Sequence, residues 1–196
     1  KDTGGEWKFF TQLPEDGWTI QFHHLVFKVQ PTGFGHIGIF PEQALNWLWI
    51  MDQLKQLNGK EIQVLNVFGY TGGSTIAAAS AGAHVTHIDA SKASVTWARR
   101  NLELSGLSDR PVRWIVDDAM KYMEREHRRG KKYDAIIMDP PSFGRGPKGE
   151  VWNIENMLSQ FMEACQNILS DSPTLLLFTT HSPGFSPSTP SGRTSC

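Results

Sequence analysis

The sequence predicts an α/β fold whose central, mostly parallel sheet is covered by helices on both faces. Apolar runs of strand length alternate with helical segments from residue 62 to residue 180, which is the pattern of right-handed βαβ units. The runs at residues 136–138 and 175–178 are continuously apolar, as expected of central strands buried on two sides. A chain of 196 residues is long enough for one domain with a full hydrophobic core.

Residues 1–32 are predicted to form a small β-rich segment ahead of the main fold. Aromatic and β-branched runs at residues 7–10 and 18–29 flank a turn-forming Pro-Glu-Asp-Gly sequence. Residues 41–57 are then predicted to be helical, because Pro41 suits a first helical position and apolar residues recur with a period of about 3.6. Asn58 and Gly59 are expected to end that helix.

The alternating region supplies the remaining elements in order. Five strands are expected, at residues 62–68, 84–89, 112–116, 133–139 and 174–180. Helices are expected between and after them, at residues 74–80, 91–105, 119–129 and 154–169. We therefore divide the chain into the β-rich segment (1–32), a main domain (33–181) and a tail (182–196) whose Ser, Pro, Thr and Gly content predicts disorder.

Composition and charge narrow the classes of function. The chain is 39% apolar and 20% charged, which is ordinary for a soluble globular protein, and it contains neither a membrane-length apolar run nor a signal segment. Two cysteines, Cys165 and Cys196, indicate a reducing, cytoplasmic location without a disulfide framework or a zinc site. The chain has 19 basic and 20 acidic residues and is thus nearly neutral. Any RNA contact should therefore be local or made by a part of the protein that precedes Lys1.

A glycine-rich loop from Asn66 to Ser74 lies where the first predicted strand of the sheet turns into a helix. Nucleotide-like cofactors bind at this place in open α/β sheets, and glycines allow a close approach and unusual dihedral angles. No lysine follows Gly72 or Gly73, which excludes a P-loop. The glycine spacing also departs from GxGxxG, so NAD is a poor second choice. A packing loop in another α/β protein is the alternative.

Acidic residues follow the next two predicted strands. Asp89 ends the second strand, where a carboxylate can accept hydrogen bonds from both hydroxyls of a ribose. Asp118 and Ala119 follow the third strand, where the carboxylate can accept from an adenine amino group and the next N–H can donate to the ring. Either acid alone could be a helix N-cap. Their arrival in register after successive strands favours a nucleoside site.

The sequence Asp139-Pro140-Pro141-Ser142-Phe143 ends the fourth predicted strand. The prolines fix the backbone, and the carboxylate and carbonyls, turned into the cleft, can orient an amino or ring nitrogen. Phe143 can stack on a base. A plain strand-ending turn is the alternative. The following residues 144–150 are expected to form a flexible basic loop that closes over substrate or stays idle in solvent.

Three of these sequences together resemble a known family. Phe-Gly-Tyr-Thr-Gly-Gly (68–73), Asp-Pro-Pro-Ser-Phe (139–143) and Gly-Ile-Phe-Pro-Glu-Gln (38–43) resemble the bacterial 23S ribosomal-RNA methyltransferases of the RlmI/RlmK-like group, over roughly residues 33–186. The resemblance implies a Rossmann-like class I methyltransferase fold, S-adenosyl-L-methionine as cofactor, ribosomal RNA as substrate and no metal. Phe68 and Tyr70 stand where the usual methyltransferase loop has glycines.

The resemblance also implies roles for individual residues. Those expected to contact the cofactor are Asn66, Phe68, Gly69, Tyr70, Thr71, Gly72, Gly73, Asp89, Ala90, Asp118, Ala119 and Asp139, with Phe40 and Gln43 upstream. Those expected to position the acceptor are Asp139, Pro140, Pro141 and Phe143. Methyl transfer from a sulfonium needs alignment more than a strong base, and good alignment can lower a barrier by roughly 7–11 kcal/mol.

Departures from the family's pattern sharpen the expected chemistry. Members that methylate cytosine C5 use a cysteine near the fourth or fifth strand, and this chain has Thr179, Thr180 and His181 there. Cys165 lies in a predicted helix and is expected to be buried and inert, so we expect a base nitrogen to be the acceptor. Asn66 replaces the acid that many methyltransferases carry, which predicts weaker cofactor binding.

Two other functions fit the same residues. One is methylation of a nitrogen in a protein or a small molecule, and the other is a cofactor- or RNA-binding module without turnover. A complete fold of this class would continue beyond the fifth strand, so truncation favours the second of these. The sequence leaves the oligomeric state open.

Overall fold

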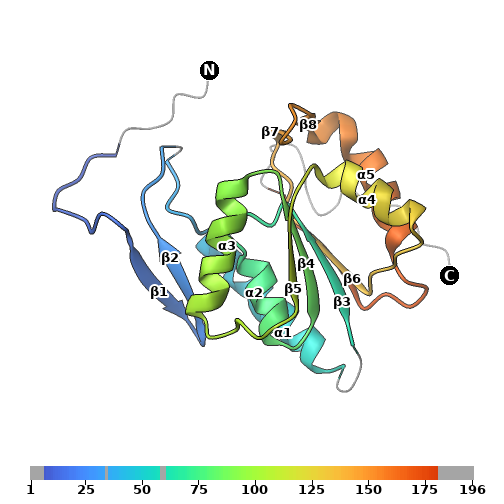
Figure 1. Ribbon diagram of the computed structural model, residues 1–196, viewed down its shortest axis with the longest axis horizontal. Coiled ribbons are helices and arrows are strands. Elements are labelled where there is room, and N and C mark those ends of the chain that lie inside the picture. The colour runs from blue at the N-terminus through green and yellow to red at the C-terminus, as the bar shows by residue number, and fades with distance from the viewer. Residues whose placement is uncertain (1–6, 34, 58–60, 181–196) are drawn as a thin grey trace.

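A computed structural model describes residues 7–33, 35–57 and 61–180. Its central sheet has five parallel strands in the order β5-β4-β3-β6-β9 (Figure 1). They are β3 (Gln63–Val67), β4 (His84–Asp89), β5 (Val112–Val116), β6 (Ala135–Met138) and β9 (Leu175–Phe178). The chain runs outward from β3 to β5 and then returns to the other side of β3, which creates a topological switch point where ligands bind in such sheets. The predicted α/β fold is confirmed.

Helices cover both faces of this sheet (Figure 1). One face carries α1 (Ala44–Lys55), α2 (Gly73–Ser80) and α3 (Lys92–Leu104), and the other carries α4 (Ala119–Arg128) and α5 (Ile154–Ile168). The segment expected to start the first helix is instead a 3-10 turn, η1 (Pro41–Gln43). The side chains of Ser91, Asp118 and Asn153 cap α3, α4 and α5 by accepting a backbone N–H from the first turn. Within the described residues, no helix combines the length and apolarity of a membrane span.

Successive residues of the inner strands pack into two separate hydrophobic cores, one on each face of the sheet. Ile137 (3% exposed) packs beneath α1 and α2, whereas Ile136 (0%) packs beneath α4 and α5, as the two-residue period of a strand requires. The predicted burial on both sides is confirmed for β6. It is wrong for β9, where Leu176 is 40% exposed, because β9 is the edge strand of the described sheet.

The N-terminal segment contains a β-hairpin that packs on the main fold. β1 (Trp18–Phe22) pairs antiparallel with β2 (Leu25–Val29), and the inward side chains of β2 are fully buried in the core beneath α1–α3. The β2 backbone is also tied to α3, since the Lys28 N–H donates to Oδ1 of Asn101 at 2.8 Å. The β-rich character predicted for this segment is therefore found in residues 18–29.

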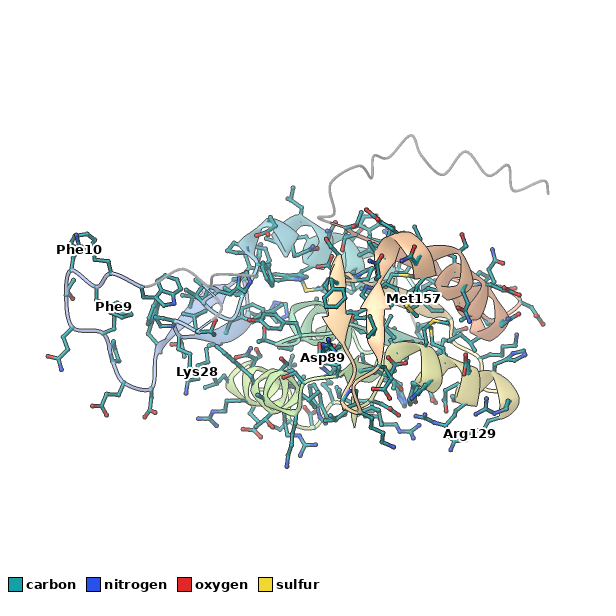
Figure 2. All side chains as sticks on the ribbon, turned by 90° about the horizontal axis from the view of Figure 1, so that it is seen from above. Phe9, Phe10, Lys28, Asp89, Arg129 and Met157 are labelled. Carbon is teal, nitrogen blue, oxygen red and sulfur yellow. The ribbon has the colours of Figure 1, made fainter. Side chains whose placement is uncertain are left out.

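The aromatic run at residues 7–10 does not form the expected strand. The Trp7 indole instead donates to the Thr32 carbonyl at 2.7 Å. Phe9 and Phe10 lie at the end of the molecule remote from Asp89 (Figure 2). The predicted helix end at Asn58-Gly59, His181 and the predicted tail lie outside the described residues.

The loop predicted to be flexible after the Asp-Pro-Pro sequence is a second hairpin. β7 (Phe143–Arg145) pairs antiparallel with β8 (Val151–Asn153). Trp152 holds it in place, because its ring is 5% exposed and packs against Phe68 and Phe161 at centroid distances of 4.9 and 5.1 Å. An ion pair of 2.6 Å between Lys121 and Glu150 joins its far end to α4. The predicted loop is thus shortened to residues 146–150, which connect the two strands, and Trp152 anchors the otherwise exposed hairpin to the protein; its flexibility stays a prediction.

Candidate active site

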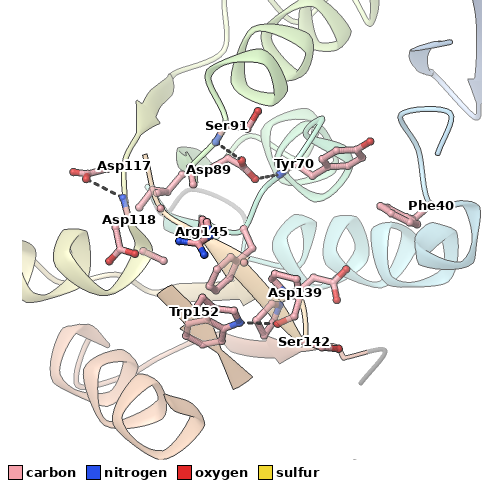
Figure 3. A pocket seen from close by; sticks show the side chains of 18 of the residues that line it. Phe40, Tyr70, Asp89, Ser91, Asp117, Asp118, Asp139, Ser142, Arg145 and Trp152 are labelled. Atoms are coloured by element: carbon pink, nitrogen blue, oxygen red, sulfur yellow. Dashed lines mark hydrogen bonds between the residues drawn. The ribbon is translucent and has the colours of Figure 1, made fainter. Parts of the chain in front are cut away.

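A cavity of about 450 Å³ lies at the carboxyl ends of the sheet strands (Figure 3). This volume falls in the range of pockets that bind small molecules. A narrow extension of about 50 Å³ adjoins it beside the glycine loop. Phe40, Phe68, Tyr70 and Asp139 line both spaces, so a ligand with two chemically different ends could occupy them together.

The structure gathers nearly all the predicted site residues around these two spaces. Those lining the main cavity are Phe40, Phe68, Tyr70, Asp89, Ala90, Asp118, Ala119, Asp139, Pro140 and Pro141. Those lining the extension include Gln43, Asn66, Gly69, Thr71, Gly72 and Gly73. Phe143 is the exception, because its side chain is 56% exposed on β7 and lies outside the cavity lining. Its stacking on a base stays a prediction.

Two aromatic residues give the glycine loop an unusual backbone. Phe68 and Tyr70 have φ angles of 57° and 46°, in the left-handed region that costs a non-glycine residue roughly 1–2 kcal/mol. Ring contacts offset this cost: Phe68 packs on Trp152, and Tyr70 lies 5.5 Å from Phe40 between ring centroids. The strained backbone is thus held by the walls of the cavity itself.

The glycines of this loop are required by packing inside the protein. A Cβ atom on Gly69 would overlap the His87 ring, and one on Gly73 would overlap the Trp47 indole. Gly72 has a φ of 90°, and a Cβ atom on it would overlap the Ala98 side chain. The expected reason for these glycines, room for a cofactor to approach the backbone, was therefore incomplete: their missing side chains would point into the protein beneath the loop.

Asp89 is held at the end of β4 by backbone donors on both of its oxygens (Figure 3). Oδ2 accepts from the Tyr70 N–H and Oδ1 from the Ser91 N–H, each at 2.8 Å. Burial raises the pKa of Asp89, and the two backbone hydrogen bonds oppose that rise. Each carboxylate oxygen has a further lone pair, so the group can also accept from vicinal hydroxyls in the cavity.

Asp118 is both a helix cap and a cavity residue. Its Oδ1 accepts from the Lys121 N–H at 3.0 Å at the start of α4, and the residue lines the main cavity with Ala119. The helix-cap alternative is therefore confirmed, and the contact of Asp118 with an adenine stays a prediction. The neighbouring Asp117, which the sequence reasoning missed, accepts from the Asp118 N–H at 2.8 Å and pairs with Arg125.

The Asp-Pro-Pro corner is oriented by two side chains from other elements. Gln43 Nε2 donates to Oδ2 of Asp139 at 3.1 Å, while its Oε1 accepts from Asn46 at 2.7 Å, which fixes the direction of the amide. The Trp152 indole donates to the Pro141 carbonyl at 2.6 Å. The Pro141 carbonyl thus already has one donor, from a residue that also lines the cavity, and its expected role toward the acceptor stays a prediction.

Two cavity residues, His36 and Trp152, gave no usable signal in the sequence. Arg145, from the predicted basic loop, is the sole Lys or Arg among the described residues that line the main cavity. Cys165 is fully buried, and burial raises the pKa of its thiol to about 12, which confirms the prediction of a buried thiol. Across the described ranges, no three His, Cys, Asp or Glu side chains are grouped so as to hold a metal ion.

Comparison with known proteins gives matches over most of the chain. The model of an S-adenosylmethionine-dependent methyltransferase family matches residues 1–185. A ribosomal RNA large subunit methyltransferase K/L from Shewanella frigidimarina is 30% identical over 152 residues, 76% of this chain. A ribosomal RNA large subunit methyltransferase I from Klebsiella pneumoniae is 38% identical over 105 residues, 53% of this chain.

Solved structures are similar over nearly the whole chain. A SAM-dependent methyltransferase from Agrobacterium tumefaciens is 42% identical with a TM-score of 0.89, over 95% of this chain and 59% of that one. A crystal structure of SMU.776 complexed with SAH is 26% identical with a TM-score of 0.78, over 92% of this chain and 46% of that one. The chain spans 20% and 24% of the length of the two curated relatives named above.

Proposed function

Because the chain belongs to the family of S-adenosylmethionine-dependent methyltransferases, we propose that it transfers a methyl group from this cofactor to a base nitrogen of ribosomal RNA. The observation that carries the proposal is the placement of Asp89, Asp118 and the Asp-Pro-Pro corner around one cavity. Carboxylates suited to an adenosine lie on one side, and a rigid acceptor corner lies on the other.

The two adjoining spaces match the two ends of the cofactor. In the main cavity, Asp89 would accept from the ribose hydroxyls, and Asp118 would accept from the adenine amino group. In the extension, the first turn of α2 offers N–H groups that have no partner within the helix, and the positive end of the helix dipole favours a carboxylate. Asn66 and Asp139, which line the extension, would supply oxygen atoms for the ammonium group of the methionine end.

The chain's own residues would mainly hold the acceptor in line. The bound cofactor supplies a methyl group already activated on a sulfonium. Asp139, oriented by Gln43, would accept from an acceptor N–H, and the two prolines would fix its position. Alignment of this kind can lower a barrier by roughly 7–11 kcal/mol, so a strong base is not needed at the acceptor.

Three observations support RNA and, within it, a nitrogen acceptor. The curated relatives are named ribosomal RNA methyltransferases. Arg145 places a cation at the cavity, where it could contact a phosphate. Cys165 is buried in α5, which removes it as a nucleophile for attack on a pyrimidine ring. An RNA substrate also agrees with the cytoplasmic location that the cysteine content indicates.

Calorimetry and methyl transfer test the proposal together. The 196-residue chain should bind S-adenosylmethionine and S-adenosylhomocysteine, and Asp89→Asn should weaken both while the exposed control Asp109→Asn should not. Tritium from labelled cofactor should appear in ribosomal RNA as an N-methylated nucleoside. Label in protein or in small molecules, binding without transfer, or an absence of binding would each contradict the proposal.

A further inference from the structure

Three buried polar side chains form a line beneath the cofactor loop. Nδ2 of Asn66 on β3 donates to Oγ1 of Thr75 on α2 at 2.7 Å, and that oxygen lies 2.8 Å from Nδ1 of His87 on β4. Asn66 is 3% exposed, and the other two are fully buried. Burying polar groups costs free energy unless they are paired, and apolar side chains would avoid this cost. The line therefore points to a role beyond packing.

The protonation state of His87 follows from its surroundings. Burial lowers its pKa to about 3, so the ring is neutral and has one acceptor and one donor nitrogen. In the described part of the chain, the Thr75 hydroxyl forms hydrogen bonds only with Asn66 and His87. Because it accepts from Asn66, its own hydrogen goes to Nδ1 of His87, and the ring proton resides on Nε2.

The surroundings of Nε2 agree with this tautomer. This nitrogen has no hydrogen-bond partner among the described residues. The His87 ring lies 5.0 Å from the Trp114 ring between centroids, with an angle of 55° between their planes. In such an arrangement an N–H can be directed at the face of an aromatic ring, which is a weak but favourable contact.

The donor–acceptor order of these hydrogen bonds determines which atom of the Asn66 amide faces the extension. Asn66 lines the extension, and its amide nitrogen is turned away toward Thr75. Its Oδ1, which can only accept hydrogen bonds, is the amide atom left for a ligand. We propose that His87, acting through Thr75, fixes the Asn66 amide so that Oδ1 accepts from the ammonium group of the cofactor's methionine end. This inference rests on the proposed function.

The opposite direction of hydrogen bonding would have the opposite effect on binding. If Nδ1 of His87 carried the proton, Thr75 would accept from it and donate to Oδ1 of Asn66. The amide NH2 group would then face the extension as a donor and disfavour an ammonium. His87 is thus a positioning residue. A carboxylate would present an acceptor oxygen in either orientation, whereas the Asn66 amide does so only when the His87 tautomer fixes its direction.

Nitrogen NMR of the wild-type chain tests the tautomer directly. With 15N-labelled histidine at neutral pH, the His87 signals should show an unprotonated Nδ1 and a protonated Nε2. They are assigned by their absence from a His87→Asn variant. A protonated Nδ1 would overturn the inference without any reference to cofactor binding.

Ligand discrimination tests the consequence for binding. Thr75→Val removes the hydroxyl with little change in volume, and Thr75→Ser retains it as the matched control. Thr75→Val should weaken the binding of S-adenosylhomocysteine about 10-fold or more, which is the typical effect of losing a hydrogen bond to a charged group. Its affinity for 5′-methylthioadenosine, which lacks the amino acid group, should be unchanged, and Thr75→Ser should restore the wild-type preference.

The outcomes separate the two proposals. Equal weakening of both ligands, or of neither, would overturn the role assigned to His87 and Thr75 while leaving the proposed function intact. A wild-type chain that binds neither ligand would instead contradict the proposed function. His87→Asn places an amide oxygen near the position of Nδ1 and should bind S-adenosylhomocysteine like Thr75→Ser; a loss equal to that of Thr75→Val would contradict the inference.

Discussion

Acidification should destabilise this fold through one buried side chain, His87. Burial holds its pKa at about 3 in the folded chain, whereas in the unfolded chain it titrates near 6.5. Below pH 6.5 the unfolded state therefore binds a proton that the folded state excludes. The stabilising contribution of neutral His87 is complete above pH 6.5, and it is lost progressively as the pH falls from 6.5 toward 3.

The size of this effect follows from the shift in pKa. Each pH unit between the two pKa values changes the free energy of unfolding by about 1.4 kcal/mol. A fall from pH 7.5 to pH 5 crosses about 1.5 such units, so His87 alone should lower the free energy of unfolding by about 2 kcal/mol. Asp89, whose pKa burial raises, acts in the opposite direction as the pH falls.

Urea unfolding at pH 7.5, 6 and 5, on wild type and on His87→Asn, isolates the contribution of the histidine. The comparison cancels Asp89, which both proteins retain. Wild type should lose about 2 kcal/mol more than the variant over this range. Parallel pH dependences in the two proteins would refute the reasoning, because they would mean that His87 takes up its proton in the folded chain.

Further substitutions test the packing of the site. Gly69→Ala should lower the unfolding midpoint, since its Cβ would overlap His87, whereas Gly33→Ala, with open space around it, should not; equal midpoints would contradict the packing. Trp152→Ala should cost about 3–5 kcal/mol of unfolding free energy in urea, and Trp152→Phe clearly less; a small loss for alanine would mean that the β7–β8 hairpin is held by other contacts. Arg145→Gln should weaken RNA binding and reduce the salt slope by about 1, as filter binding at several salt concentrations can show, while the exposed control Arg128→Gln leaves both unchanged.

Local rules predicted the part of the fold that places the cofactor loop. The strands at residues 84–89 and 112–116 match β4 and β5 to the residue, because runs rich in β-branched and aromatic residues are bounded there by clear turn and cap signals. Asp89 and Asp118 could be assigned to one site because parallel strands bring their carboxyl ends to one edge of a sheet. These are consequences of period and topology, which the sequence carries directly.

Long-range packing accounts for what the sequence did not reveal. The residues around Arg145 look like a loop, with two glycines and a proline in four positions, and the long-range contacts of Trp152 with Phe68 and of Glu150 with Lys121 hold them in a hairpin. The reason for Gly69 was equally hidden, because its neighbour His87 lies 18 positions away and on another strand. No local rule relates such pairs.

The Trp152 indole touches both halves of the site, and this gives the site a thermodynamic property. One ring packs on Phe68 of the cofactor loop and donates to the Pro141 carbonyl of the acceptor corner. A movement of Phe68 or of Pro141 would shift the indole and, through it, the other residue. Binding of the cofactor should therefore change the affinity for the acceptor base. Thermodynamic linkage makes this influence reciprocal: the factor by which the bound cofactor changes the affinity for the nucleobase must equal the factor by which the bound nucleobase changes the affinity for the cofactor.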